Sequence, residues 1–287
     1  MFNLKMKLES DHLALWSEKL SAVLAMRQLT ITEDVDVEAA INRAATRFKN
    51  VKGQVVVVPL YGFISHKPTV YSALGWETSS ETFVGWLEEL VSNSDVGAIV
   101  IDVDSPGGTV AGLSSASERI YNMRGTKPIV AVSSDLNASA AYFLSSSADE
   151  VVADPDSLTG SIGTIAIHAS YEKLLEANGV DVTIIKAGKY KDEGNPYQAL
   201  TEEAKENYQS MVDGYYETFV AAVARNRNMT PAKVKSQFGQ GRVLSALEAK
   251  NVGMVDRVAT VRDVVAGVRR RAKRNFKNKL TLMKLKA

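Results

Sequence analysis

The residue whose surroundings best support chemistry is Ser139, in the segment Asn137-Ala138-Ser139-Ala140-Ala141-Tyr142. An apolar run before it predicts a strand, and the small residues after it predict a helix. At a strand-to-helix turn a serine meets unpaired N–H groups and the positive end of the helix dipole, where an oxyanion is stabilised. Serine is also a common helix cap, and this segment taken alone favours the cap.

Two other segments follow predicted strands. In Ser105-Pro106-Gly107-Gly108 the two glycines allow close approach of a ligand and can turn N–H groups inward as oxyanion donors. It is not a phosphate loop, because the Gly-Lys-Ser/Thr ending is missing. The second segment, Lys186–Tyr197, contains Lys189 and Lys191, and without further context it indicates a solvated loop.

Residue counts limit the other kinds of site. The chain has no cysteine, which excludes a thiol nucleophile, disulfides and zinc–thiolate sites. Its three histidines, His12, His66 and His168, stand in no motif, and we expect surface or packing roles for them. A Ser–His–Asp triad is not excluded by counting, but nothing points to it. We expect no metal and no cofactor.

The elements that must position these residues alternate between strand and helix from Gly53 onward. Continuous apolar strands separated by helices of ten to fifteen residues indicate βαβ units and a largely parallel sheet. Both ends of the chain are predicted to be helical: residues 1–50 before the sheet, and the chain after Thr201. The predicted strands are 55–60, 96–103, 129–132, 150–153 and 182–185, and the later helices are 171–178, 202–226, 231–238, 244–250 and one from Arg262.

Composition places the chain among ordinary globular proteins, with 45% hydrophobic and 23% charged residues. The net charge of +1 argues against a nucleic-acid binder that uses its whole surface, although basic residues gather from Arg262 onward. Residues 1–10 lack the apolar core of a signal peptide, and no window approaches the roughly 18 apolar residues of a membrane helix. We therefore expect a cytoplasmic protein with no membrane partner.

Taken together, these segments resemble peptidase family S49, the signal-peptide-peptidase-A family. Four landmarks come in the family's order: Ser-Pro-Gly-Gly, Asn-Ala-Ser-Ala-Ala-Tyr, Leu-Thr-Gly-Ser-Ile-Gly and Ala-Gly-Lys-Tyr-Lys-Asp. The resemblance covers roughly Val55 to Val258. The continuation Gly194-Asn-Pro-Tyr197 looks more like the phage branch, whose capsid assembly proteases cut scaffold, portal or capsid proteins inside the prohead.

The resemblance implies a role for each of five residues. Ser139 becomes the nucleophile, Lys191 the general base and Ser161 the hydroxyl that positions the lysine, while Gly107 and Gly108 line the oxyanion hole. A lysine acts as a base only when neutral, and burial can lower its pKa from about 10.4 by as much as 3–5 units. In cellular members the serine is usually followed by Gly-Gly-Tyr-Tyr, whereas here residues 140–143 are Ala-Ala-Tyr-Phe. The neighbouring Lys189 is the alternative base.

The resemblance also implies an α/β fold of the ClpP/crotonase type, a spiral of ββα units with helical N- and C-terminal extensions. We expect a helical extension over 1–52, the peptidase domain over 53–260 and a basic tail over 261–287. A ring-like homo-oligomer is implied, and in half-length members of the family the serine and lysine of one site come from neighbouring subunits. Its groove would admit extended polypeptides with small or apolar side chains.

The function we expect is a Ser/Lys endopeptidase of the phage maturation type. A cytoplasmic bacterial relative that degrades signal peptides is the alternative within the family. Two other classes are a crotonase-type acyl-CoA enzyme, which does not need this serine and lysine, and an inactive assembly module. The basic tail indicates a solvated helix, or else a tether to acidic scaffold or nucleic acid, or a segment removed by self-cleavage.

Overall fold

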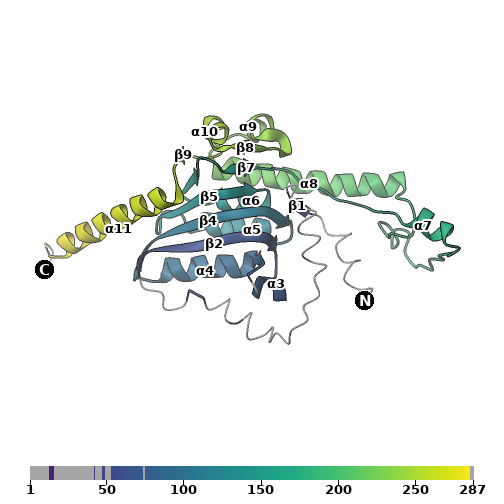
Figure 1. Ribbon diagram of the computed structural model, residues 1–287, viewed down its shortest axis with the longest axis horizontal. Coiled ribbons are helices and arrows are strands. Elements are labelled where there is room, and N and C mark those ends of the chain that lie inside the picture. Colours follow the sequence, from purple (N-terminus) through teal and green to yellow (C-terminus); the bar gives the residue numbers. More distant parts are fainter. Residues whose placement is uncertain (1–12, 16–41, 43–46, 49–52, 74, 285–287) are drawn as a thin grey trace.

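The computed structural model describes residues 13–15, 42, 47–48, 53–73 and 75–284. Within these residues one sheet forms the body, with the central strand order β3-β2-β4-β5-β6-β9 (Figure 1). Its ladders are parallel except for β1 with β4 and β7 with β8, so the predicted parallel α/β class is confirmed. The strands are β1 Leu13–Leu15, β2 Gly53–Ser65, β3 Glu77–Ser79, β4 Val96–Thr109, β5 Ile129–Ala138, β6 Glu150–Ala153, β7 Leu158–Gly160, β8 Val243–Ser245 and β9 Arg257–Val258.

Helices connect the parallel strands and make up most of the chain from Glu202 to Lys284. The residues that begin several of them carry side-chain caps: Ser79, Thr201 and Thr230 each accept a hydrogen bond from the first turn, and Ser245 forms a capping box with Glu248. The helices are α3 Val70–Ala73, α4 Ser80–Ser92, α5 Leu113–Asn122, α6 Ala140–Ser145, α7 Glu172–Ala177, α8 Glu202–Asn226, α9 Pro231–Gln237, α10 Ala246–Val252 and α11 Val261–Lys284.

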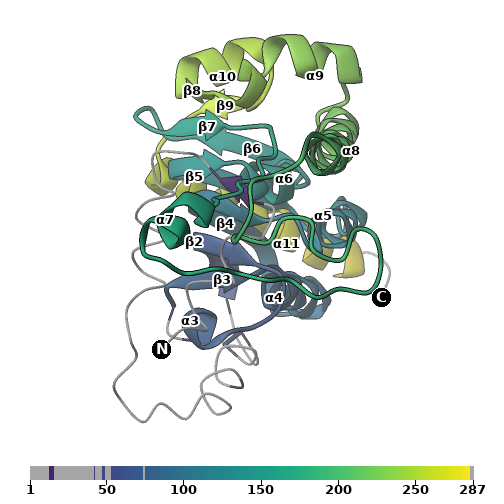
Figure 2. The same cartoon turned by 90° about the vertical axis from the view of Figure 1, so that its right-hand side faces the viewer.

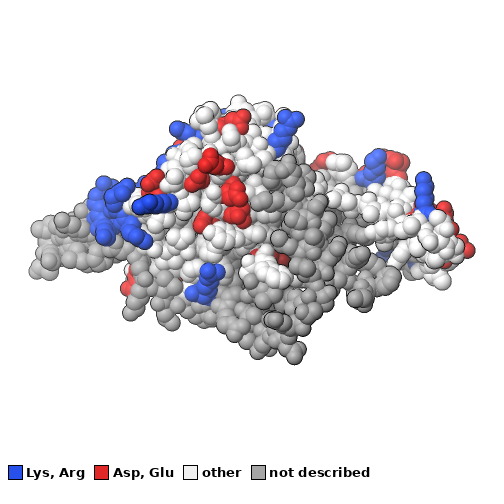
Figure 3. Space-filling view, viewed as in Figure 1, with Lys and Arg blue, Asp and Glu red and all other residues white. Residues whose placement is uncertain are grey.

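Both faces of the sheet are covered, which explains the continuous apolar strands. Alternate residues of β4 point to opposite faces: Ile99 and Ile101 enter the main core with residues of α4, α5, α6 and α8. Val100 belongs to a second core, in which Val264 and Val268 of α11 pack on the other face. The basic helix is thus attached to the sheet at its start. It then projects from the body, where its arginines and lysines form a basic cluster (Figures 1 and 3).

The structure corrects three predictions made from local patterns. Leu13–Leu15, predicted as helix, form β1, because an edge of β4 offers them hydrogen-bond partners. The rest of the helix predicted over 1–50 lies almost entirely outside the described residues. Residues 182–185 are not a strand, since no strand among the described residues pairs with them. The strand predicted over 55–60 is longer than expected, because β2 continues to Ser65 beside β3 and β4.

Residues 164–200 form an arm that leaves the body beside the first half of α8 (Figures 1 and 2). The arm contains α7, which buries none of its residues. Several large apolar side chains of the arm are exposed, including Ile185 at 95% and Leu174 at 59%. Within the described residues the arm therefore has no core of its own. Among the helices described here, none is both long and apolar enough to cross a membrane.

Candidate active site

Ser139 lies at the turn where β5 ends and α6 begins. Its φ of 54° and ψ of −119° are strained values for a residue with a side chain. The side chain is fully buried, and within the described part of the chain its Oγ has no hydrogen-bond partner. It makes no capping bond to the helix, so the interpretation of Ser139 as an ordinary cap is wrong. A sharp, strained strand-to-helix turn is also how hydrolases expose a nucleophilic serine.

Ser161 lies next to Ser139 because their strands are neighbours in register. Ala138 of β5 pairs with Gly160 of β7, and each serine follows its paired residue. The Ser139 N–H donates to the Gly160 carbonyl at 2.8 Å, and the Ser161 N–H donates to the Arg242 carbonyl at 2.8 Å. Ser161 also has a positive φ, 55°. Since neighbouring strands lie about 4.8 Å apart, the structure brings these two predicted residues together.

The glycine pair lies at the end of β4, the strand on the other side of β5. Gly108 pairs with Ile64 so closely that an added Cβ would lie 1.8 Å from the Ile64 carbonyl oxygen. Gly107 has a φ of 104°, which favours glycine. Its N–H donates to Ser105 Oγ at 3.1 Å, so in this structure that donor is engaged. The oxyanion role of Gly107 and Gly108 stays a prediction.

Asn137 supports the Ser139 turn and was not singled out from its residue type. It is fully buried, and its Nδ2 donates to Ser133 Oγ at 3.0 Å and to Ser145 Oγ at 2.9 Å. Ser145 Oγ in turn donates to Asn137 Oδ1 at 3.0 Å. These bonds tie the end of α6 to the strand before Ser139. The signal available in the sequence was an amide residue two positions before the candidate nucleophile.

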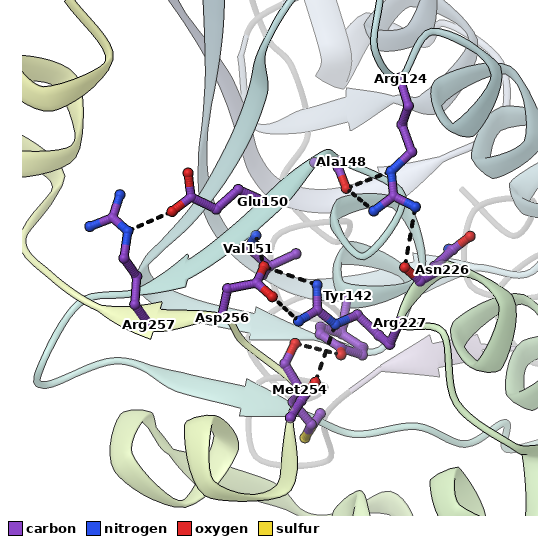
Figure 4. A network of polar contacts seen from close by, with 11 residues as sticks. Arg124, Tyr142, Ala148, Glu150, Val151, Asn226, Arg227, Met254, Asp256 and Arg257 are labelled. Carbon is purple, nitrogen blue, oxygen red and sulfur yellow. Dashed lines mark hydrogen bonds and ion pairs between the residues drawn. The ribbon is translucent and has the colours of Figure 1, made fainter. Parts of the chain in front are cut away.

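A second polar network anchors α6 through Tyr142 (Figure 4). The buried Tyr142 hydroxyl donates to the Met254 carbonyl at 2.9 Å, and burial raises the pKa of Tyr142 above its usual range. Arg227 forms a two-bond ion pair with Asp256, at 2.6 and 3.1 Å, and Asp256 also accepts from the Val151 N–H at 2.8 Å. Burial acts to raise the Asp256 pKa, but these hydrogen bonds outweigh it and hold that pKa below its ordinary value.

Lys191 lies on the arm and is exposed, so within one chain the structure does not bring it to Ser139. The three lysines of this segment differ in their partners. Lys186 pairs with Asp192, and Lys189 donates to Glu203 at 2.7 Å and to the Tyr190 hydroxyl at 2.8 Å. The hydrogen bond that Lys189 donates to Glu203, and then the one that it donates to Tyr190, raise the pKa of Lys189 and keep it charged. Among described residues, Lys191 Nζ has no such partner.

The histidines do not join these residues. On the arm, His168 lies 3.0 Å from the Asn195 carbonyl oxygen. His66, in the loop after β2, lies against Gly112, the residue before α5. His12 lies outside the described residues. In the described part of the chain, no three His, Asp or Glu side chains are grouped as metal ligands would be.

Known proteins similar to this chain include proteases of phage and cellular origin. The "Capsid assembly protease C" of Escherichia phage lambda is 28% identical over 256 residues, 89% of this chain and 57% of that protein. The "Putative protease MJ0651" of Methanocaldococcus jannaschii is 36% identical over 183 residues, 64% of this chain and 58% of that protein. A solved structure, a ClpP1 mutant from Listeria monocytogenes, superposes with a TM-score of 0.41 at 16% identity over 72% of this chain and 94% of that one.

The chain therefore spans less than two thirds of the length of these two relatives. The family profile described as "Peptidase family S49" matches residues 122–275, which is more than half of the chain and contains Ser139, Ser161 and Lys191. The family expected from the sequence is confirmed. This protein belongs to peptidase family S49.

Proposed function

We propose that this protein is a serine endopeptidase in which Ser139 is the nucleophile, Lys191 the general base and Ser161 the group that positions the lysine. The observation that carries the proposal is the Ser139 turn: a strained, buried serine at the start of a helix, in register with Ser161. The structure supplies no catalytic partner for its Oγ among the described residues. The base must therefore come from elsewhere.

A second copy of the chain is the source of the base that we propose. Lys191 lies on an arm that extends away from the body. The exposed apolar side chains of that arm are the kind that protein–protein interfaces bury. If each arm lies on the next body, the contact is head-to-tail, and repetition of such a contact closes a ring. Each site then combines the Ser139 of one copy with the Lys191 of its neighbour.

The proposed mechanism follows from burial of the lysine at that contact. Transfer from water to an apolar surface disfavours the ammonium form, so the pKa of Lys191 falls and the neutral amine becomes accessible. The amine takes the Ser139 proton as Oγ attacks the substrate carbonyl, and returns it to the leaving amine. The first N–H groups of α6 and the glycine pair stabilise the oxyanion. Lys189 is unsuited, because its ion pair with Glu203 holds it charged.

For the substrate, we propose scaffold, portal or capsid proteins cut during phage prohead maturation. Support comes from the phage lambda protease, whose match extends over 89% of this chain, and from the Gly194–Tyr197 continuation. The alternative is a cytoplasmic bacterial peptidase that degrades signal peptides, which the "Putative signal peptide peptidase SppA" of Enterococcus faecium supports at 30% identity. Both alternatives use the same site.

The test is to incubate the purified full chain separately with head proteins encoded beside it and with signal peptides. Wild-type protein should cleave one of the two sets, and Ser139→Ala should cleave neither while showing an unchanged circular dichroism spectrum. Cleavage of the head proteins supports the maturation role, and cleavage of signal peptides alone contradicts it. Equal cleavage by the folded Ser139→Ala variant would refute the proposed nucleophile.

A further inference from the structure

The N-terminal strand β1 lies on the strand that carries the glycine pair. Leu13–Leu15 runs antiparallel to the end of β4, where Leu15 pairs with Gly107 and Ala14 with Gly108. The opposite edge of the same β4 segment pairs with β2. β4 thus has β2 along one edge. Along its other edge it pairs first with β5, over residues 99–105, and then with β1, over residues 107–109.

The register places β1 level with Ser139. The last pair between β4 and β5 is Ser105 with Asn137. The next residue of β4 is Pro106, which has no N–H to continue a ladder. Two residues beyond that last pair, β4 reaches Gly107, the partner of Leu15, while β5 leads into Ser139. Leu15 thus lies on the edge of β4 that faces Ser139, and Figure 1 draws β1 at the same end of β4 and β5.

An extended strand beside the candidate nucleophile has the conformation of a bound substrate. Proteases and other peptide-binding proteins commonly hold a chain as an extended strand added to an exposed sheet edge by main-chain hydrogen bonds. The segment Leu13-Ala14-Leu15 consists of small and apolar residues, the kind that we expect in the groove. Its Leu15 end adjoins Gly107, one of the predicted oxyanion donors. The complete burial of Ser139 fits a site that is already covered.

We propose that Leu13–Leu15 is the first substrate of this site, cut after Leu15, and that it keeps other polypeptides out until it is cut. This inference rests on the proposed function. Ser139 Oγ attacks the Leu15 carbonyl carbon and gives its proton to the base. The bond between Leu15 and Trp16 breaks, and the Trp16 nitrogen takes that proton. Water then hydrolyses the Leu15 ester, which releases residues 1–15 with a new carboxylate and restores the Ser139 hydroxyl.

The position of β1 can be tested without catalysis, because the natural chain contains no cysteine. Ser139→Cys is combined with Leu15→Cys or with Ala14→Cys, since alternate strand residues face opposite sides. Leu15 pairs with β4 two residues beyond the last β4–β5 pair, and Ser139 lies two residues beyond that pair, just after β5. A disulfide between them requires a Cα separation of about 4.4–6.8 Å, which the oxidation tests. Mild oxidation should give an intramolecular disulfide in at least one pair. The control pairs Leu15→Cys with Leu247→Cys, which lies exposed on α10. A disulfide between two chains, or none, would contradict the placement.

Self-cleavage is tested by measuring the mass and N-terminal sequence of the assembled full chain. Wild-type protein should lose residues 1–15 and begin at Trp16, and Ser139→Ala should stay intact. Leu15→Asp should process itself about tenfold more slowly or worse, because a charged residue replaces an apolar one beside the bond that is cut. Leu4→Asp, the same change outside β1, should process as wild type does.

The outcomes separate this inference from the function on which it rests. If the wild-type protein cleaves added polypeptides through Ser139 but keeps residues 1–15, the self-substrate proposal is wrong and the proposed function stands. If the disulfide forms but neither the chain nor any added polypeptide is cut, the proposed function is wrong, and the self-substrate proposal is wrong with it.

Discussion

Ser139 and Gly160 are joined by a backbone hydrogen bond of 2.8 Å, which ties the turn before α6 to the residue just before Ser161. The strand pair Ala138–Gly160 ends at this bond, and both serines that follow it have φ near 55°. The β5–β7 strand pair holds these two strained serines side by side, which gives the candidate site a rigid support. This relationship leads to a prediction about strain.

Replacing Ser139 should give two inactive proteins of different stability. Glycine adopts a positive φ without strain, whereas alanine has the same steric limits as serine. We expect Ser139→Gly to be more stable than Ser139→Ala by about 1 kcal/mol in the free energy of unfolding. Urea denaturation of both variants measures the difference. If Ser139→Ala is the more stable of the two, the turn is not strained as described.

Asn137 should be required for activity although it does not touch the substrate. Asn137→Ala leaves the hydroxyls of Ser133 and Ser145 without their amide partner in a buried place. We expect a loss of about 1–3 kcal/mol in stability, and a kcat lower in the fraction that stays folded. The control is Asn251→Ala, an exposed position on α10. An unchanged kcat per folded molecule would show that Asn137 only stabilises the fold.

The ion pair of Asp256 with Arg227 should make stability depend on acid pH. The pKa of Asp256 is lowered in the folded protein, so its contribution is fully present above the ordinary carboxyl pKa of about 4 and is lost as pH falls through the lowered value. The melting temperature of Asp256→Asn should therefore fall less between pH 6 and pH 2 than that of the wild type. The exposed Asp156→Asn serves as the control. Parallel curves for wild type and Asp256→Asn would contradict this assignment.

Lys189 and Lys191 of the arm should behave differently. Lys191→Arg should be inactive because arginine stays charged, and kcat of the wild type should rise with pH as the base becomes neutral. Lys189→Ala removes an exposed pair with Glu203 and should retain substantial activity. Peptide hydrolysis measured across pH checks both. If Lys189 is essential and Lys191 dispensable, the base has been assigned to the wrong lysine.

The local signals in the sequence were sufficient for most of the body. The pattern predicted the helix 202–226 with the bounds of α8. That Ser139 and Ser161 belong to one site was implied by the family resemblance, and their neighbouring positions in register agree with it. The pairing of β1 could not be predicted, because three residues inside an amphipathic pattern become a strand only when β4 offers an edge. The largely apolar run at 182–185 predicted a strand, but no strand among the described residues pairs with it.

The relation of Lys191 to Ser139 could not be derived from the pattern either. Sequence spacing fixes the order of the two residues, but their meeting depends on where the arm of a second copy lies. The structure of one chain shows the arm extended and its apolar side chains exposed. The shared site is therefore the central claim, and it needs a test with two different chains.

The most direct test mixes two inactive proteins, Ser139→Ala and Lys191→Ala. They are unfolded together, refolded as mixed assemblies and compared with each variant refolded alone, after light scattering has shown equal size. If each site takes its serine and its lysine from different copies, random mixing should restore about a quarter of the sites, while each variant alone stays inactive. A mixed assembly of the correct size with no activity would place both residues in one chain and contradict the account.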